Sequence, residues 1–164
     1  MYAYCEIISA SKFDSDSLYV QYQFALPVQG GWSWPPEWDK HEMDRRRSGS
    51  TQVSHIGYAG GKSDAAAQDG TSIIYPVAHF GYPFELQCIA TEKKGKDVMM
   101  TGDWPQLFFE VGSCGCWGRH YVEGYGYASI PRRPGTYEID VHTWKPRGSI
   151  RDRMSDYFLG GALY

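Results

Sequence analysis

The residues with the greatest chemical potential lie together in one short stretch. Cys114, Cys116 and His120 have side chains that bind zinc or take part in thiol chemistry. A structural zinc site needs four ligands, and this stretch offers three. Cys116 and His120 have the types of a nucleophile and its base, but the sequence marks no third group to orient the histidine. We therefore expect no metal site and no catalytic residue, and interpret the stretch as a turn with free thiols.

The rest of the sequence also lacks the signatures of catalysis. It contains no G-x-S-x-G, no H-E-x-x-H and no phosphate-binding loop. We predict that the protein is not an enzyme and uses no cofactor and no small-molecule substrate. The net charge of −3 and the pI near 5.9 argue against nucleic acid as a partner, because nucleic-acid-binding domains usually carry a basic footprint.

Composition also indicates the compartment. No apolar run approaches the roughly 18 residues that a transmembrane helix needs. The first residues lack the basic start and the apolar middle of a secretory signal. Without such a signal, the four cysteines in this chain of 164 residues are more typical of free thiols than of a disulfide framework. We predict an intracellular location.

The Cys-rich turn must be positioned by strands. The clearest one spans residues 18–26, where apolar side chains from Leu18 to Leu26 occupy every second position and predict one buried face. Gly124 and Gly126 mark a bulge or a close approach of another backbone within a later strand. The other predicted strands span residues 3–10, 84–90, 107–111, 120–130 and 137–143.

Residues 29–71 do not follow this pattern. They are polar, small and glycine-rich, which predicts a long flexible loop insertion with one short strand near residues 50–58. At the other end of the chain, Ser149 can cap a short C-terminal helix that stops at Gly160 and Gly161. About seven short strands and this one helix favour an all-β fold, an antiparallel sandwich or barrel.

Several motifs resemble the B9 domain of ciliary transition-zone proteins. The resemblance implies that residues 1–164 form a single C2-like antiparallel β-sandwich. It also implies a non-catalytic scaffold that assembles with two other B9-domain proteins in ciliogenesis and ciliary gating. The implied location is the cytoplasm and cytoskeleton at the base of the cilium, in the transition zone or basal body. The motifs, in chain order, are FDSDSLYVQY (13–22), WSWPP (32–36), HFGYPFE (79–85), WPQLFFEV (104–111), PGTYEIDVHTWKPRGS (134–149) and YFLGG (157–161).

The chain departs from the wider pattern in two ways. Family members continue beyond the Gly160-Gly161 pair with at least one more strand, so we expect either a truncated product or a sandwich without its last strand. The resemblance also places Ser113 and Gly115 where calcium-binding C2 domains carry aspartate. Asp14 and Asp16 alone are too few for Ca²⁺, which takes six to eight oxygen ligands.

Two sets of residues are candidates for binding. Trp and Arg are enriched among the residues that dominate protein interfaces, so we predict that partners contact Trp32, Trp34, Trp38, Trp117 and Arg119. The alternative function is calcium-independent binding to anionic membrane lipid, in which each cation near the surface contributes about 1 kcal/mol. The lipid-facing candidates, expected on one face, are Arg45, Arg46, Arg47, Lys93, Lys94, Lys96, Arg132 and Arg133.

Overall fold

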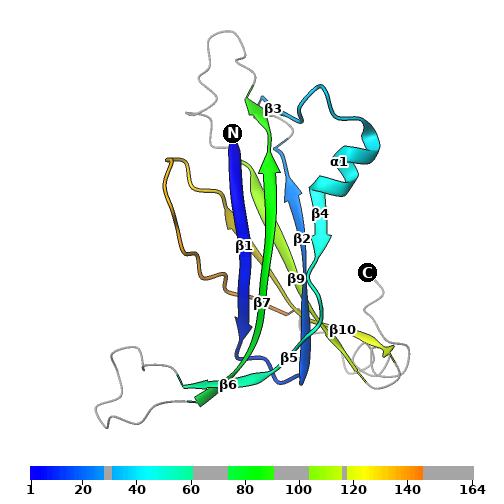
Figure 1. Ribbon diagram of the computed structural model, residues 1–164, viewed down its shortest axis with the longest axis vertical. Helices are drawn as coiled ribbons and strands as arrows, with labels where there is room; N and C mark the ends of the chain where they lie inside the picture. Colours follow the sequence, from blue (N-terminus) through cyan, green and yellow to red (C-terminus); the bar gives the residue numbers. More distant parts are fainter. Residues whose placement is uncertain (28–30, 61–73, 91–103, 116–117, 146–164) are drawn as a thin grey trace.

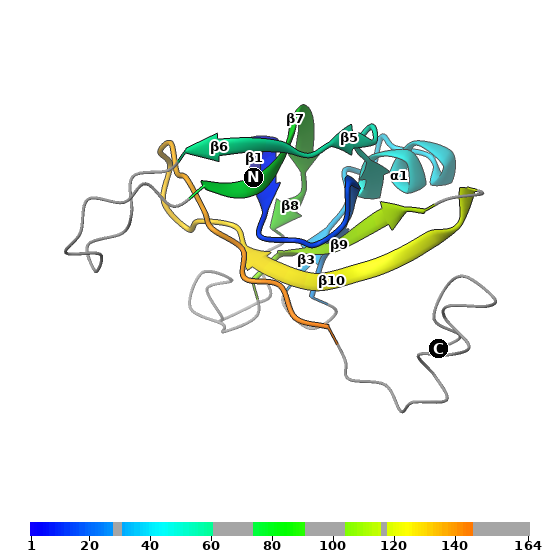
Figure 2. The same ribbon diagram turned by 90° about the horizontal axis from the view of Figure 1, so that it is seen from below.

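Two antiparallel sheets stacked face to face form the body of the protein (Figures 1 and 2). The structure is a computed structural model that describes residues 1–27, 31–60, 74–90, 104–115 and 118–145. The predicted all-β, C2-like antiparallel sandwich is confirmed. The predicted C-terminal helix at residues 149–161 lies outside the described residues.

The first sheet has three strands and the second has five. The first has the order β1-β7-β6, made of β1 (Tyr2–Ser11), β7 (Ile74–Gln87) and β6 (Gly57–Gly60). The second has the order β10-β9-β2-β4, with β5 also paired to β2; its strands are β10 (His120–Ser129), β9 (Gln106–Cys114), β2 (Ser17–Ala25), β4 (Ser48–Ser50) and β5 (Ser54–His55). A separate pair joins β3 (Trp32–Ser33) to β8 (Ile89–Ala90).

The core lies between the two sheets and follows the predicted alternation of β2. Leu18, Val20, Tyr22 and Phe24 are buried, whereas Gln21 is exposed. These side chains meet the inward-facing residues of β7 and β9 in two clusters. Burying a Leu or Phe side chain stabilises the fold by about 1.5–3 kcal/mol, so this strand contributes a large share of the stability.

Tyr19 departs from that alternation, because it is buried on the outer face of β2. Its direct partner on β9 is Gly112, whose missing side chain leaves room for the ring. A Cβ atom at Gly112 would lie only 2.3 Å from Tyr19 Cζ. The ring of His120 packs edge-on against Tyr19, with centroids 5.4 Å apart. Burial raises the pKa of the Tyr19 hydroxyl.

Both alternatives predicted for the glycines of β10 occur. The register against β9 shifts between Val122 and Gly124, which makes Glu123 the extra residue of a β-bulge. A Cβ atom at Gly126 would lie 2.8 Å from Val141 Cγ1, so the later segment does approach this strand closely.

The prediction of a strand at residues 137–143 is wrong, because the structure has no strand there. The structure has only one bridge nearby, between Tyr125 and Trp144, held by two backbone hydrogen bonds of 2.8 Å. Tyr137 and Ile139 are about half exposed, because no described strand lies beside them. The alternation in the sequence therefore did not correspond to a buried face.

Residues 29–71 were predicted as a long loop with one short strand, and the described part, residues 31–60, differs. It contains the helix α1 (Lys40–Arg47) and the short strands β3, β4, β5 and β6. Asp39 caps the helix, since its Oδ1 accepts a hydrogen bond of 2.7 Å from the N–H of Glu42. The helix buries none of its residues, so it has no apolar periodicity by which the sequence could reveal it. Within the described ranges no helix has the length and apolar composition of a membrane span.

Candidate functional site

Three of the tryptophans predicted to bind partners, Trp32, Trp34 and Trp38, form part of one end of the sandwich. Trp32 and Trp34 are half-buried and pack against the core cluster. Trp32 meets Trp104 edge-on at 4.9 Å between centroids, and Trp34 meets the fully buried Phe24 at 5.5 Å. Trp38 stacks on Trp34 at 6.2 Å. Trp32 and Trp34 thus fold back onto the core, and only part of each side chain remains accessible to a partner.

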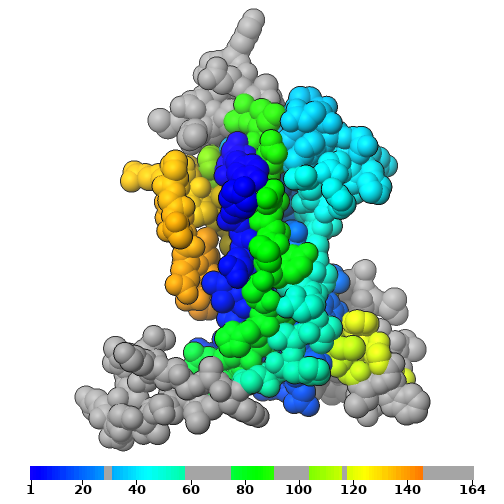
Figure 3. Space-filling view, viewed as in Figure 1, coloured from blue at the N-terminus to red at the C-terminus, as the bar shows by residue number. Residues whose placement is uncertain are grey.

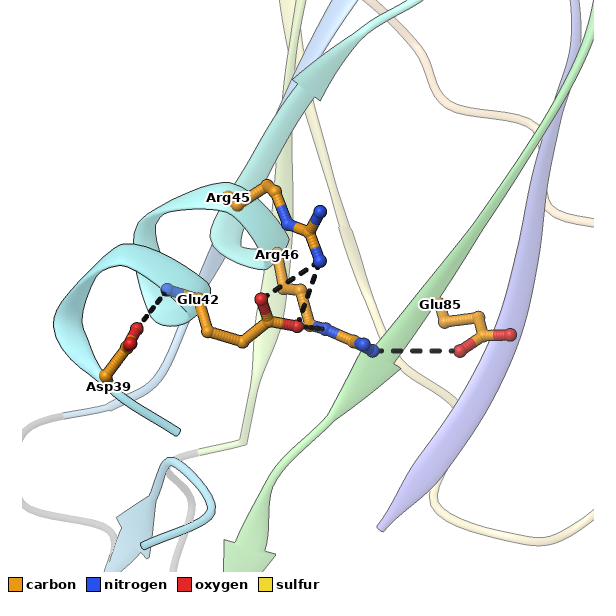
Figure 4. A network of polar contacts seen from close by, with 5 residues as sticks. All are labelled: Asp39, Glu42, Arg45, Arg46 and Glu85. Carbon is orange, nitrogen blue, oxygen red and sulfur yellow. Dashed lines mark hydrogen bonds and ion pairs between the residues drawn. The ribbon is translucent and has the colours of Figure 1, made fainter. Parts of the chain in front are cut away.

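Arg46 links α1 to the first sheet (Figure 4). Its Nε lies 2.5 Å from Glu42 Oε1 and its Nη1 lies 3.8 Å from Glu85 Oε2 on β7. The guanidinium also lies over the ring of Trp38, 5.0 Å from the centroid. Arg45 shares the same Glu42 carboxylate at 2.9 Å. Hydrogen bonds from Arg46, and to a smaller extent from Arg45, lower the pKa of the Glu42 carboxyl group.

The basic residues predicted to face lipid are not brought to one face in the described part of the chain. Arg45 and Arg47 are exposed on α1. Arg132 and Arg133 belong to the segment 130–145, which lies on the opposite side of the sandwich from α1 in both views (Figures 1 and 2). The Arg132 guanidinium lies 5.2 Å from the ring centroid of Trp104. Lys93, Lys94, Lys96 and Trp117 lie outside the described residues.

Glu123 joins the β1–β2 turn to the end of β9 at one loop tip of the sandwich. Its Oε1 accepts hydrogen bonds from the hydroxyls of Ser15, at 2.5 Å, and Ser113, at 2.6 Å. Lys145 Nζ lies 3.8 Å from the other carboxylate oxygen. Asp14 and Asp16 are exposed beside this cluster. Among the described residues no group of three or more His, Cys, Asp or Glu is placed to hold a metal ion.

The motifs in the sequence did not identify Glu123 as a residue of this site. Its position depends on the bulge in β10, which turns this one side chain toward the β1–β2 turn. The glycine on its C-terminal side was the available signal, because glycine within a strand often marks a bulge.

Two of the described thiols, those of Cys5 and Cys88, are poor nucleophiles. Cys5, Cys88 and Cys114 form no disulfide. Burial raises the pKa of Cys5, and it raises the pKa of Cys88 to about 11, so both remain protonated at neutral pH. Cys114 is directly opposite His120 across the β9–β10 ladder, and Cys116 lies outside the described residues.

One edge of the first sheet is open along β1, which pairs with β7 alone among the described strands. Met1 and Cys88 exchange two hydrogen bonds, of 2.6 and 3.1 Å. Bonded and non-bonded pairs alternate along an antiparallel ladder, and the register is continuous from Tyr2 to Ile7. The N–H and C=O groups of Tyr2, Tyr4 and Glu6 therefore point away from β7. We call these backbone groups the β1 edge.

Beside the β1 edge, the side chains of Tyr2, Tyr4 and Glu6 are exposed on the outer face of the first sheet. Tyr4 is 76% exposed, and its ring packs edge-on against that of Tyr2 at 4.9 Å. Hydrogen bonds to Tyr4 and to Glu85 raise the pKa of the Tyr2 hydroxyl. Figure 3 shows this strand lying along the front of the molecule beside β7. Aromatic side chains next to an open edge are typical of a surface that binds another chain.

A second group of aromatic side chains lies on the outer face of the second sheet. Phe108 and Tyr127 are directly opposite each other, with ring centroids 6.3 Å apart. Trp144 is 58% exposed and packs against Tyr125 at 5.7 Å. The sequence patterns did not predict this aromatic group either. The signal was Phe108 itself, an apolar residue at a position of β9 that alternation assigns to solvent.

The fold defines a C2-like β-sandwich whose most prominent described surfaces are an open strand edge and exposed aromatic side chains. The chain belongs to the B9 family: it matches the family described as "Ciliary basal body-associated, B9 protein" over residues 1–164. The B9 domain is not a known enzyme family.

Relatives of two kinds are similar to this chain. Tectonic-like complex member MKS1 from Homo sapiens is 32% identical over 161 residues, which cover 96% of this chain and 24% of the relative. B9 domain-containing protein 2 from Homo sapiens is 28% identical over 156 residues, covering 95% of this chain and 70% of the relative. The chain thus spans about a quarter of the length of MKS1. No solved structure matches the chain.

Proposed function

We propose that this chain is a non-catalytic interaction module at the base of the cilium, where it assembles with two other B9-domain proteins and supports ciliogenesis and ciliary gating. The observation that carries the proposal is the B9 match along the whole sequence. One relative is named a member of a tectonic-like complex, which supports a role in an assembly. The cytoplasm and cytoskeleton of the transition zone or basal body are the proposed location.

The physical character of the described surfaces supports this proposal. An open strand edge and exposed Tyr and Trp side chains suit protein contacts. The Glu123 carboxylate at the loop tip is already bound by two hydroxyls. Arg119 is exposed beside that tip and remains, with Trp38 and Trp117, a proposed partner contact.

Co-expression tests the proposal directly. The tagged chain is expressed with the two other B9-domain proteins of its organism, and the complex is isolated by affinity and size-exclusion chromatography. We expect one peak containing all three proteins. Arg119→Ala should weaken the complex at temperatures well below the melting temperature of that variant, while Gln21→Ala, an exposed change on β2, should change neither the complex nor the melting temperature. Separate elution of the three unmodified proteins would refute the assembly role.

The second candidate function is calcium-independent binding to anionic lipid. It is favoured by the exposed Arg45 and Arg47 on α1, although Arg45 is partly neutralised by Glu42. Flotation with vesicles that contain phosphatidylserine tests it at low and high salt. Binding that is lost at high salt and in Arg45→Ala/Arg47→Ala would support this function, and protein that stays at the bottom of the gradient at low salt would contradict it.

A further inference from the structure

We propose that the β1 edge is where a partner docks, by adding an extended strand to the first sheet. The inference rests on the proposed function, because it assigns a place and a chemistry to the contact with another B9-domain protein. The partner strand pairs with the outward N–H and C=O groups of Tyr2, Tyr4 and Glu6. It thereby becomes the fourth strand of the described sheet, beside β1.

The first argument is that β1 has few of the features that protect strand edges. Proteins block exposed edges with short strands, with charged side chains (Lys above all), with Pro, or with bulges that twist the edge away. The stretch from Tyr2 to Ile7 contains no Lys and no Pro, Glu6 is its one charged residue, and its register against β7 is uninterrupted. The shift beyond Ile7 places the extra residue on β7, where Gly81 adopts a φ of +55° that glycine accommodates readily, so β1 itself is not bulged there.

The second argument is that the other described edges are protected. At the far side of the first sheet β6 has four residues and covers β7 only from Ile74 to Val77; beyond them the β7 edge is interrupted by the bulge at Gly81 and by Pro83. At one side of the second sheet β4 has three residues. At the other side, β10 is bulged at Glu123 and bridges to Trp144 through two backbone hydrogen bonds. Of the edges in the described part of the chain, the β1 edge is the long and regular one.

The side chains of β1 define the chemistry of the partner strand. Ala3, Cys5 and Ile7 face inward and pack against the core cluster, so the neighbouring positions of a fourth strand need apolar residues. On the outer face the partner meets the exposed rings of Tyr2 and Tyr4 and then the carboxylate of Glu6. Opposite charges across a ladder are favourable. The partner is therefore an extended, mainly apolar segment with one Lys or Arg beside Glu6.

A second copy of this chain fits less well. Two β1 strands paired antiparallel would place Glu6 opposite another Glu6, a tyrosine or an apolar residue, according to register. None of these side chains is a cation, so both carboxylates would lose solvent without gaining a charge partner. The charge on this edge favours a different protein with a basic residue.

Amide hydrogen exchange in the complex provides the sharpest test. The probe is the complex with the two co-expressed B9-domain proteins, compared with the chain alone. In the free chain the amides of Ala3, Cys5 and Ile7 are protected by β7, whereas those of Tyr2, Tyr4 and Glu6 exchange fast. Strand addition should slow the exchange of the even-numbered amides at least about tenfold. A complex in which they still exchange fast would overturn the inference while leaving the proposed function intact.

Substitutions on the edge give an independent readout. Tyr4→Pro removes an N–H that points away from β7, which edge strands tolerate, and should weaken the complex about tenfold or more. Tyr4→Val is the matched control, since it keeps the N–H, and should weaken binding less than Tyr4→Pro. Glu6→Lys should weaken the complex several-fold at low salt and less at high salt. If Tyr4→Pro binds the partner proteins with wild-type affinity, strand addition at the β1 edge is refuted. If the chain alone forms a homodimer that Tyr4→Pro abolishes, the edge binds a second copy and not a different B9-domain protein. Failure of the unmodified proteins to associate would overturn the proposed function as well.

Discussion

Replacing Gly112 by Ala should destabilise this protein, although the same change usually stabilises a strand. The Cβ atom of an alanine at this position would lie 2.3 Å from Tyr19 Cζ and 2.5 Å from the Tyr19 hydroxyl oxygen. Non-bonded carbon atoms prefer separations of about 3.5–4.0 Å, so the ring must retreat by more than about 1 Å. Tyr19 is 8% exposed and also packs against His120, so a retreat breaks existing contacts.

The magnitude follows from two opposing effects. Overpacking of a well-packed site costs about 1–3 kcal/mol. The smaller conformational entropy of alanine in the unfolded chain returns about 0.4–1 kcal/mol. We expect a net loss of about 1–2 kcal/mol in the free energy of unfolding. For a domain of this size each kcal/mol lowers the melting temperature by about 2–4 °C, so the fall should be about 2–8 °C.

Thermal unfolding followed by circular dichroism measures this loss, and two comparisons separate its causes. Gly57→Ala is the matched control, because a Cβ atom there meets nothing closer than Val77 O at 3.9 Å; its stability should be unchanged or slightly higher. In a Tyr19→Thr background, which removes the ring, Gly112→Ala should cost nothing further. The reasoning fails if Gly112→Ala melts with the wild type, or if the loss is the same without the Tyr19 ring.

Three further changes test other parts of the structure. Trp34→Ala should lower the free energy of unfolding by about 2–3 kcal/mol in urea titrations, less than the roughly 3–5 kcal/mol typical of a core aromatic, because Trp34 is only half-buried. The exposed Trp144→Ala should stay within about 0.5 kcal/mol; equal effects would mean that Trp34 does not pack against the core. Glu123→Ala removes the acceptor of the buried Ser113 hydroxyl and should lower the free energy of unfolding by about 1–3 kcal/mol in the same titration. An unchanged free energy of unfolding would mean that Glu123 does not hold the loop tip together. Burial raises the pKa of Tyr22 to about 12, so its contribution to stability is complete below pH 10 and is lost between pH 10 and 12; Tyr22→Phe should reduce this alkaline loss, and identical alkaline unfolding curves would contradict the assignment.

Strands with one buried and one solvated face could be predicted from the sequence. The positions from Leu18 to Phe24 alternate because period-two burial is the physical cause of the pattern. Leu107 and Val111 on β9 are buried for the same reason. The resemblance to B9 proteins supplied the layered arrangement, which alternation alone left open between sandwich and barrel.

Features held by local polar contacts could not be predicted in the same way. The helix α1 buries none of its residues and depends on the Asp39 cap and on the pairs that Glu42 makes with Arg45 and Arg46. Such contacts leave no periodic signal. The sequence therefore indicated a loop.

The burial of side chains that depend on tertiary contacts could not be predicted from the sequence either. Tyr19 is buried because a glycine lies opposite it on another strand, and Trp32 and Trp34 are half-buried because β3 pairs with β8. An aromatic residue in a proline-containing segment gives no indication of which surface it will cover. The candidate partner contacts rest on residue type alone, which does not indicate burial. The β1 edge can be located only from the hydrogen-bond register between β1 and β7.

The bulge at Glu123 gives β10 one residue more than its ladder with β9 requires. Upstream of it Val122 is opposite Gly112, and downstream Gly124 is opposite Val111, which is the next residue on β9. Removing Glu123 would therefore leave every later pair in place, with Tyr125 still opposite Glu110 and Tyr127 still opposite Phe108. What would disappear is the carboxylate that accepts hydrogen bonds from Ser15 and Ser113. The extra residue thus serves the contact between the turns, and this is the point at which β10 can lose a residue without turning its later side chains over.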